Sequence, residues 1–304
     1  MTDILIIGAG PAGLTAAVYA RRAGLTVTIL ESNMYGGQIL TTPEVENYPS
    51  IQKISGWELA EKLYEQAVAL GAELIFDEVR GLEDLGTHKK ITTAAGAELE
   101  ARTVIIANGA KRRKLEVPGE DSHLGMGVSY CATCDGAFFA GKTACVVGGG
   151  STALEDALYL ANLCEKVHLI HRREGFRGQQ TLLDAVMAHE KIEIHTNRVP
   201  LEVLGEGPVS AIRLRDTQTL EEETLPTDAV FVAIGLSPDN AIFSPLVKLD
   251  ESGYILAAED CHTNIPGIYA AGDTRRKMLR QIITAASDGA IAATEAAAYL
   301  QTLK

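Results

Sequence analysis

The sequence predicts an α/β protein with two parallel-sheet domains, the second inserted into the first. Three observations support this prediction. The segment that begins at Ile4 recurs without a gap from Ala144, at an offset of 140 residues. Each copy has an apolar β-branched run, a glycine-rich turn, an Ala/Leu-rich helical stretch and a second apolar run, which is the pattern of a βαβ unit. A length of 304 residues also corresponds to about two domains of roughly 150 residues.

The segments between and after the two copies complete the predicted domains. Residues 56–70 have helical spacing, residues 103–107 and 229–235 each form an apolar run ending at a glycine-containing turn, and a long Ala-rich helix follows residues 268–273. Two stretches have the composition of linkers, the basic residues 111–119 and the Ser-Pro-Asp-Asn run 237–240. We therefore expect one domain to comprise residues 1–114 and 242–304, and the inserted domain to comprise residues 115–241.

Composition and charge restrict the possible partners. The chain has 27 Lys and Arg against 40 Asp and Glu, a formal charge of −13, and 46% hydrophobic residues. Such an acidic chain repels nucleic acid and anionic membranes, so we expect neither as a partner. No apolar run approaches the roughly 18 residues of a membrane helix, and the N-terminus does not have the basic start of a signal peptide. Five cysteines are too few for a disulfide scaffold, and an odd number favours a reducing, cytoplasmic location.

The first glycine-rich turn has the residues and context of a Rossmann-like dinucleotide site. Gly8, Gly10 and Gly13 follow a predicted strand and open a predicted helix. The first glycine permits a tight turn, the second lets the backbone approach a pyrophosphate, and the third lets helix and strand pack closely. Glu31 ends the next strand, where a carboxylate can accept a hydrogen bond from an unphosphorylated ribose. This turn therefore predicts a site for FAD or NAD, and the alternative is a plain glycine turn with a solvated Glu.

The second turn predicts a different ligand. Gly148, Gly150 and Ala153 form a GxGxxA motif, and the following strand ends in a basic run at His171, Arg172 and Arg173, with Arg177 four residues later. Guanidinium groups bind a 2′-phosphate bidentately, so these arginines favour NADPH over NADH. The alternative is an ordinary basic surface patch.

Cys131 and Cys134 form a CxxC pair followed directly by Asp135. Two cysteines at this spacing at a helix start can close a disulfide, and the helix dipole would lower the pKa of the leading thiol. Asp135 could relay a proton to a departing thiolate. A zinc site needs four ligands, and no second CxxC or HxxxH pair accompanies this one, so we expect no metal. The other cysteines at 145, 164 and 261 are expected to be unreactive core residues, and an unreactive structural CxxC remains an alternative.

Taken together, these motifs resemble the low-molecular-weight, bacterial-type thioredoxin reductases, a class II pyridine nucleotide-disulfide oxidoreductase family, over essentially the whole chain. The resemblance is carried by GAGPAGLTAA, GGQ at 36–38, ENYP at 46–49, CATCDG at 131–136, VVGGGSTALEDALYL, HLIHRREGFR and GIYAAGD ending at Asp273, followed by Arg280-Gln281. It implies a homodimeric flavoenzyme that passes electrons from NADPH through FAD and the dithiol to thioredoxin. In that family Cys134 would face the flavin, Cys131 would attack the thioredoxin disulfide, Asp135 would donate the proton, and the two domains would swivel on their linkers.

The resemblance also implies a set of cofactor-binding residues. For FAD these are Gly8, Gly10, Pro11, Ala12, Gly13, Glu31, Gly36, Gly37, Gln38, Asn47, Val79, Gly109, Gly272, Asp273, Arg280, Gln281 and Ile282. For NADPH they are Gly148, Gly150, Ser151, Thr152, Ala153, His171, Arg172, Arg173, Arg177, Ile234 and Gly235.

Three positions depart from the family pattern. Asn108 replaces a usual threonine, Ile282 replaces a usual alanine, and no arginine follows the Phe138-Phe139 pair, where relatives often carry one that docks thioredoxin. These departures put the fit of the partner in question. The alternatives are a relative fed by ferredoxin, a relative serving a peroxiredoxin-type partner, and a non-catalytic flavin-binding redox sensor.

Overall fold

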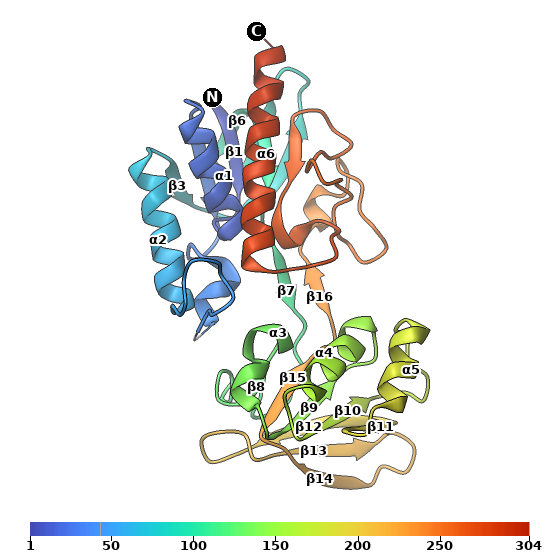
Figure 1. Ribbon diagram of the computed structural model, residues 1–304. Coiled ribbons are helices and arrows are strands. Elements are labelled where there is room, and N and C mark those ends of the chain that lie inside the picture. The colour runs from blue at the N-terminus through green and yellow to red at the C-terminus, as the bar shows by residue number, and fades with distance from the viewer. Residues whose placement is uncertain (43, 304) are drawn as a thin grey trace. The chain divides into compact units, whose positions relative to one another are not determined.

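The computed structural model describes residues 1–42 and 44–303, and its chain divides into two compact units. The first unit is formed by Met1–Lys111 and Ser237–Lys304, and the second by Arg112–Leu236. The chain therefore crosses between units three and five residues earlier than the expected boundaries at 114 and 241. Short strands lie at the two crossings and pair with each other, β7 (Ala110–Arg112) and β16 (Leu236–Pro238). The insertion of one α/β unit into another confirms the predicted fold class (Figure 1).

A seven-stranded sheet forms the centre of the first unit, in the order β3-β2-β1-β6-β5-β4, with β17 also paired to β6. Strands β1, β2, β3, β6 and β17 pair in parallel, and β4, β5 and β6 pair antiparallel. The strands are β1 (Thr2–Ile7), β2 (Val27–Glu31), β3 (Glu73–Phe76), β4 (Val79–Asp84), β5 (Lys89–Thr93), β6 (Glu98–Ile106) and β17 (Ile268–Ala270).

Three long helices belong to this unit, α1 (Pro11–Arg22), α2 (Gly56–Ala69) and α6 (Ile282–Thr302). Figure 1 shows α1 and α6 side by side. The two helices can cross closely because Gly289 has no side chain. A Cβ atom there would lie 2.1 Å from the carbonyl oxygen of Ala12. The predicted helix at 56–70 is confirmed, and Ser55 caps it by accepting a hydrogen bond from the Glu58 amide. Short 3₁₀ turns are η1 (Gly37–Thr41), η3 (Ala241–Phe243) and η4 (Gly272–Thr274).

The second unit repeats the parallel βαβ plan in a smaller form. Its five-stranded sheet has the order β11-β10-β9-β15-β8, and a three-stranded antiparallel sheet, β12-β13-β14, accompanies it. The strands are β8 (Val128–Ser129), β9 (Thr143–Val147), β10 (Lys166–His171), β11 (Ile192–Thr196), β12 (Arg198–Leu204), β13 (Ala211–Asp216), β14 (Glu222–Pro226) and β15 (Ala229–Val232). The helices are α3 (Ala132–Asp135), the 3₁₀ turn η2 (Gly136–Phe139), α4 (Ser151–Ala161) and α5 (Gln180–Ala188).

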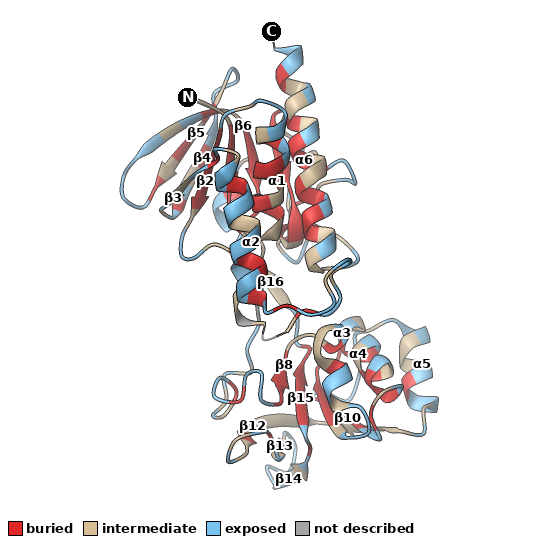
Figure 2. Ribbon diagram, turned by 60° about the vertical axis from the view of Figure 1, so that its left-hand side comes forward, coloured by how far each residue is buried: buried red, intermediate tan, exposed pale blue. Residues whose placement is uncertain are grey.

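Both sheets are buried on two faces, as their continuous apolar runs predict. In β1, Ile4 and Ile6 pack on the helical side with α1 and α6, whereas Leu5 and Ile7 pack on the other side. In β9, Val146 packs on the α4 side and Val147 on the side of β12 and β13. Figure 2 shows this burial concentrated in the central strands and the inner helix faces. Burial of each such side chain stabilises the fold by about 1.5–3 kcal/mol. The strands that precede the glycine turns are therefore held firmly in the core.

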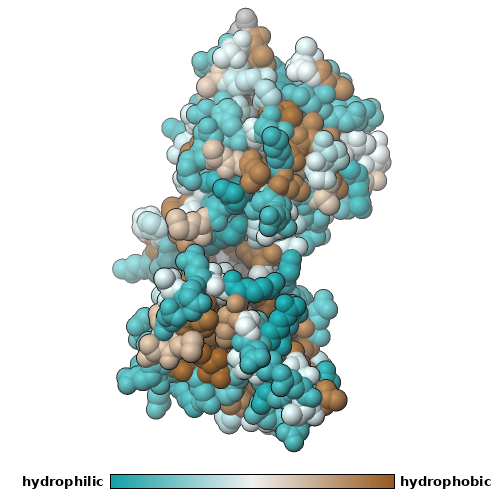
Figure 3. Space-filling view, turned by 90° about the vertical axis from the view of Figure 1, so that its right-hand side faces the viewer, coloured by the Kyte–Doolittle hydropathy of each residue, from teal (hydrophilic) through white to brown (hydrophobic). Residues whose placement is uncertain are grey.

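The surface agrees with the acidic, polar composition. On the face that Figure 3 presents, hydrophilic side chains predominate, with smaller hydrophobic areas between them. Among the described residues, none of the helices has the length and apolar character that crossing a membrane requires.

Candidate functional site

The three glycines of the first turn have two different structural roles. A Cβ atom on Gly8 would lie 2.5 Å from the Ala107 carbonyl oxygen, and one on Gly13 would lie 1.9 Å from the Gly8 carbonyl oxygen. These two positions therefore exclude any side chain. A Cβ atom on Gly10, the N-cap of α1, would meet no heavy atom within 4 Å. Open space therefore lies in front of Gly10 and the N-terminus of α1, where Pro11 occupies a first-turn position.

A second glycine turn lies directly over this opening. Gly36 and Gly37 both have positive φ, at 102° and 59°, and the Gly36 amide donates to the Ala9 carbonyl at 2.7 Å. A Cβ atom on Gly37 would lie 3.4 Å from the Gly10 Cα atom. The two turns therefore face each other across a narrow space that side chains would fill.

The C-terminal part of the chain adds a third turn to the same place. A Cβ atom on Gly272, at φ 80°, would lie 2.8 Å from the Ala12 Cβ atom, so this turn packs on the first turn of α1. The Gly272 amide donates a 2.9 Å hydrogen bond to Oδ2 of the buried Asp288. The neighbouring Asp273 is thereby placed beside the start of α1.

Asp288 is held by two cations as well as by the Gly272 amide. Arg275 donates from Nε to Oδ2 and from Nη2 to Oδ1, at 2.8 and 2.9 Å, and Lys277 Nζ lies 2.8 Å from Oδ2. Burial alone would raise the pKa of Asp288, but the hydrogen bonds from Arg275 and Lys277 hold this pKa below its usual value. Sequence reasoning missed this cluster, although a single acid on the apolar side of an Ala-rich helix is a signal for a buried partner.

Further predicted cofactor residues make hydrogen bonds or ring contacts within the first unit. Asn47 Nδ2 donates to Gln281 Oε1 at 3.0 Å, although 234 positions separate them in sequence. Gln38 Nε2 donates to the Ala110 carbonyl at 2.5 Å. The guanidinium of Arg280 lies 4.1 Å above the Tyr254 ring.

The packing of Ile282 accounts for an isoleucine where the family usually has alanine. It is the first residue of α6 and packs against the apolar cluster that contains Ile39 and Leu59. Val79 is buried at the start of β4, and a Cβ atom on Gly109, at φ 68°, would meet no heavy atom within 4 Å.

The Glu31 carboxylate is bound by backbone amides. Oε2 accepts from the Ala9 amide at 2.8 Å and Oε1 from the Asn33 amide at 2.9 Å. The carboxylate is therefore fixed at the end of β2, one strand away from the first glycine turn, and keeps lone pairs for another donor.

The second unit repeats the geometry of the first glycine turn. A Cβ atom on Gly148 would lie 2.4 Å from the Ala233 carbonyl oxygen, whereas one on Gly150, the N-cap of α4, would meet no heavy atom within 4 Å. Ser151, Thr152 and Ala153 form the first turn of α4. The same opening therefore lies before the helix N-terminus. Ile234 and Gly235 follow β15, the strand next to β9, and Gly235 has φ 104°.

The arginine-bearing loop folds back onto this turn. The Arg177 amide donates to the Gly149 carbonyl at 2.8 Å, and the side chains of Arg172, Arg173 and Arg177 are exposed. His171 is buried, stacks on Phe176 and contacts the Gly175 carbonyl at 3.1 Å. His171 therefore holds the loop through its contacts with Gly175 and Phe176, while the three arginine side chains remain accessible to an anion.

Cys131 and Cys134 form a disulfide in the second unit. The expected helix at this point is only the four residues of α3, with Cys131 as its N-cap, and it continues as the 3₁₀ turn η2. A single turn carries only a small dipole, so the expected dipole effect on the Cys131 thiol has little structural basis. Ala132 anchors the turn in the apolar core beneath it.

Ser129, at the end of β8, connects the two ends of the disulfide motif. Its Oγ donates a 2.6 Å hydrogen bond to Asp135 Oδ2 and accepts a 3.1 Å hydrogen bond from the Cys131 amide. Sequence reasoning also missed Ser129, because a serine two residues before a CxxC motif is unremarkable until the fold brings it against the aspartate.

The remaining cysteines are buried, as expected. Burial raises the pKa of the Cys145, Cys164 and Cys261 thiols, that of Cys261 to about 12. They therefore stay protonated and unreactive near neutral pH.

Comparison with known proteins places these features in a family. The profile of the pyridine nucleotide-disulphide oxidoreductases matches residues 2–289. The thioredoxin reductases of Bacillus subtilis and Listeria innocua are 45% and 44% identical over 303 residues, covering 99% of this chain and 96% and 95% of the respective relatives. The crystal structure of the Streptococcus pyogenes thioredoxin reductase superimposes with a TM-score of 0.94 at 43% identity, covering 99% of both chains. The chain belongs to the thioredoxin reductase family.

Thioredoxin reductases of this family use FAD and NADPH, and the two openings fit such groups. Both Gly10 and Gly150 leave free the volume that a Cβ atom would occupy, and each precedes a helix of eleven or twelve residues. A pyrophosphate suits both places, because the helix N-termini present unpaired amides and the positive end of a dipole.

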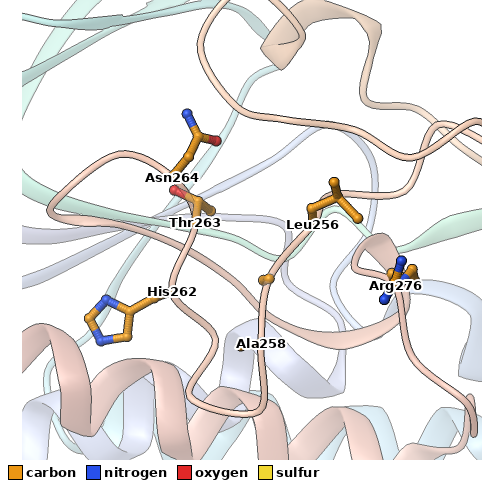
Figure 4. A pocket seen from close by; sticks show the side chains of 7 residues that line it. Leu256, Ala258, His262, Thr263, Asn264 and Arg276 are labelled. Atoms are coloured by element: carbon orange, nitrogen blue, oxygen red, sulfur yellow. The ribbon is translucent and has the colours of Figure 1, made fainter.

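A surface cavity of about 380 Å³ lies elsewhere in the first unit of this thioredoxin reductase family member. Figure 4 shows His262, Thr263 and Asn264 along one side of it and Leu256 and Arg276 along the other. No predicted cofactor residue lines this cavity, so we do not assign it to either nucleotide.

Proposed function

We propose that this protein reduces the disulfide of thioredoxin with electrons from NADPH, through FAD and the Cys131–Cys134 pair. The observation that carries the proposal is the Cys131–Cys134 disulfide, which lies in the same unit as the Gly150 opening and its arginine loop. Family membership supplies the reaction class, and the residues below assign the roles within it.

FAD is assigned to the opening at Gly10, between the turns at Gly36-Gly37 and Gly272-Asp273. Asp288 holds the last of these turns, and the Asn47–Gln281 hydrogen bond joins the segment after η1 to the start of α6. Glu31 is placed to accept from a ribose hydroxyl. When bound, FAD supplies the two-electron chemistry that connects a nicotinamide to a disulfide.

NADPH is assigned to the opening at Gly150. The α4 N-terminus binds the pyrophosphate, and Arg172, Arg173 and Arg177 bind the 2′-phosphate. The Arg177–Gly149 backbone hydrogen bond ties the arginine-bearing loop to the glycine turn, and these guanidinium groups would hold the 2′-phosphate when NADPH is bound.

The dithiol chemistry balances with one electron pair and two protons. Two electrons break the Cys131–Cys134 bond, and two protons convert the two sulfurs to thiols. Cys131 then attacks the thioredoxin disulfide as the thiolate and forms a mixed disulfide, and Asp135 protonates the thiolate that departs from thioredoxin. The Cys134 thiolate resolves this mixed disulfide, which restores the Cys131–Cys134 bond and releases reduced thioredoxin with both protons.

The surface beside the dithiol offers an aromatic contact for the partner. Phe138 is 44% exposed, whereas Phe139 packs edge-on against Phe231 in the core. Phe138 therefore supplies an apolar contact close to Cys134, at a place where the docking arginine of relatives is absent.

Trapping the mixed disulfide tests these roles. A Cys134→Ser enzyme should form a covalent adduct with an activated thioredoxin variant that keeps one active-site cysteine, visible on a non-reducing gel. A Cys131→Ser enzyme should form none. Adduct formation by Cys131→Ser alone would exchange the two roles.

We also propose a homodimer in the cytoplasm. The odd number of cysteines favours a reducing compartment, and the resemblance of the chain to the bacterial-type family implies the dimer. Size-exclusion chromatography with light scattering should give about twice the 32.4 kDa chain mass, and a single-chain mass would contradict the dimer.

A further inference from the structure

Three side chains on adjacent strands of the second unit form a compact group, which we call the HEH cluster. His168 lies on β10, and Glu193 and His195 lie on β11, the edge strand of the five-stranded sheet. One possible ligand atom from each of the three side chains lies within 4.8 Å of the other two. Among the described residues, this is the single group of three or more His, Cys, Asp or Glu side chains that meets this criterion. His168 precedes Glu193 and His195 by 25 and 27 positions, so sequence spacing gave no indication of the cluster.

The register of the two strands brings the group together. His168 pairs with Glu193, and Ile170 pairs with His195, in the parallel β10–β11 ladder. Residues two apart on a strand project from the same face, so Glu193 and His195 share the face of His168. Ile170, on that same face, packs toward β12 and β13. The HEH cluster therefore lies on the side of the antiparallel sheet.

The distances in the cluster match those between ligands of one metal ion. His168 Nδ1 and His195 Nε2 are 3.0 Å apart, and Glu193 oxygens lie 3.8 Å from the first nitrogen and 3.5 Å from the second. Ligands at about 2.0–2.2 Å from a tetrahedral Zn²⁺ are separated by about 3.4 Å. Shifts of a few tenths of an ångström would therefore place all three ligands around one ion.

The donor types of the cluster also suit a metal. Imidazole with a carboxylate is a donor set that zinc and its neighbours prefer. The two ring nitrogens of His168 and His195 share one hydrogen bond, and a change of tautomer in the donating ring would give both nitrogens a lone pair for the ion.

Charged neighbours compete with a metal but do not block it. Lys166 Nζ lies 2.6 Å from Glu193 Oε2, in a pair whose side chains are both about half exposed. Such an exposed ion pair is worth only about 0–1 kcal/mol, so a divalent ion can displace the ammonium group. Arg198 is already paired with Asp216 and Glu223.

We propose that His168, Glu193 and His195 bind a divalent transition-metal ion of the zinc type, with water completing its coordination. The ion joins the edge strand β11 to β10 and stabilises the second unit. The HEH cluster contains neither of the disulfide cysteines nor any residue assigned above to a cofactor, so this proposal stands apart from the proposed function.

Calorimetric titration of the tag-free, FAD-loaded, oxidised enzyme with Zn²⁺ tests the proposal. The disulfide form is used because a reduced Cys131–Cys134 pair would itself bind zinc. We expect one Zn²⁺ per chain and a melting temperature that rises with Zn²⁺ concentration. His195→Gln should weaken binding by at least about 100-fold, since even outer-shell partners are worth about 10–100-fold.

A matched control is available in the first unit. His262 lies 3.2 Å from Glu295 in a pair that lacks a second histidine, so His262→Gln should leave Zn²⁺ affinity unchanged. His168→Gln should weaken binding to the same extent, and His195→Gln decides the matter if the more buried His168→Gln variant does not fold. Absence of saturable binding, or wild-type affinity in His195→Gln, would overturn the proposal.

Discussion

Ser129 Oγ donates a 2.6 Å hydrogen bond to the carboxylate of Asp135, the residue proposed to protonate the departing thiolate. Ser129 is 4% exposed and also accepts from the Cys131 amide. It therefore sets the position of Asp135 relative to the disulfide turn without reaching substrate itself, and we regard Ser129 as a positioning residue.

Replacing Ser129 by Ala should slow reduction of the thioredoxin disulfide by about 10- to 150-fold, because one hydrogen bond to a charged group is worth about 1.5–3 kcal/mol. Stopped-flow absorbance would measure thioredoxin-dependent reoxidation of the pre-reduced enzyme as a function of pH. The pH profile should shift, while reduction of the flavin by NADPH should keep its rate. Ser129→Thr, which keeps the hydroxyl, should restore part of the lost rate. A profile identical to wild type in Ser129→Ala would contradict this role.

The double variant Arg172→Ala, Arg173→Ala should raise the KM for NADPH by about 10- to 100-fold, since losing both charge-assisted contacts with the 2′-phosphate costs about 1.4–2.8 kcal/mol in total. The KM for NADH should change little. Arg215, an exposed arginine on β13, provides the control, and Arg215→Ala should leave both constants unaltered. An equal loss for both nucleotides would refute 2′-phosphate recognition.

Alanine at two glycines of one turn should have opposite consequences. Gly10→Ala places a methyl group in open space, so the apoprotein should keep its stability within about 0.5 kcal/mol, while FAD binds at least about tenfold more weakly. Gly13→Ala brings a Cβ atom to 1.9 Å from the Gly8 carbonyl oxygen and should destabilise the fold by about 1–3 kcal/mol.

Urea unfolding of the apoprotein and flavin fluorescence titration would separate the two effects. Gly81→Ala on β4 is the control, because its Cβ atom would make ordinary contacts with Thr92 from 3.5 Å. Normal FAD affinity in Gly10→Ala would place the pyrophosphate elsewhere.

Asp288→Asn should destabilise the first unit by about 3–5 kcal/mol at pH 7, since it leaves Arg275 and Lys277 as buried cations without their counter-ion. It should also release FAD more readily, because the Gly272 turn loses part of its support. Chemical denaturation with far-UV circular dichroism and flavin release would report both. Glu295→Gln, in a half-exposed pair with His262, should change stability by less than about 1 kcal/mol.

The pH dependence of stability gives a second readout for Asp288. Its pKa in the folded protein lies below its unfolded value of about 3.9. The stabilisation is therefore fully present above that value and is lost as the pH falls through the folded pKa. The acid limb of the stability curve below about pH 4 should be shallower in Asp288→Asn than in wild type. An unchanged limb would show that Asp288 does not titrate with unfolding.

Much of this arrangement could be predicted from sequence, because it depends on local patterns. The glycine spacing, the apolar runs on both sides and the basic run after His171 are read within about 30 residues, and the two turns have the predicted openings at Gly10 and Gly150. The CxxC motif also predicts its own disulfide partner, since Cys131 and Cys134 are three positions apart.

The remaining features depend on contacts between distant segments. Asp288 supports the Gly272 turn only because α6 runs back across α1, and Ser129 reaches Asp135 only because β8 ends beside α3. The helix expected to start at Cys131 is only the four residues of α3, and η2 continues it as a 3₁₀ turn. A Cβ atom on Gly136 would lie 2.9 Å from Leu160 and 3.1 Å from Tyr159, so this position excludes a side chain. His168 and His195 meet through the β10–β11 register. Periodicity alone does not reveal such pairings.

The most direct test of the account compares NADPH and NADH oxidation by the FAD-loaded enzyme, with oxidised thioredoxin as acceptor, in wild type and Cys131→Ser. The account predicts rapid thioredoxin-dependent turnover with NADPH and slow turnover with NADH in wild type. Cys131→Ser should retain FAD and its reduction by NADPH but lose turnover with thioredoxin. Thioredoxin-dependent turnover that survives in Cys131→Ser would contradict the central role of the Cys131–Cys134 pair.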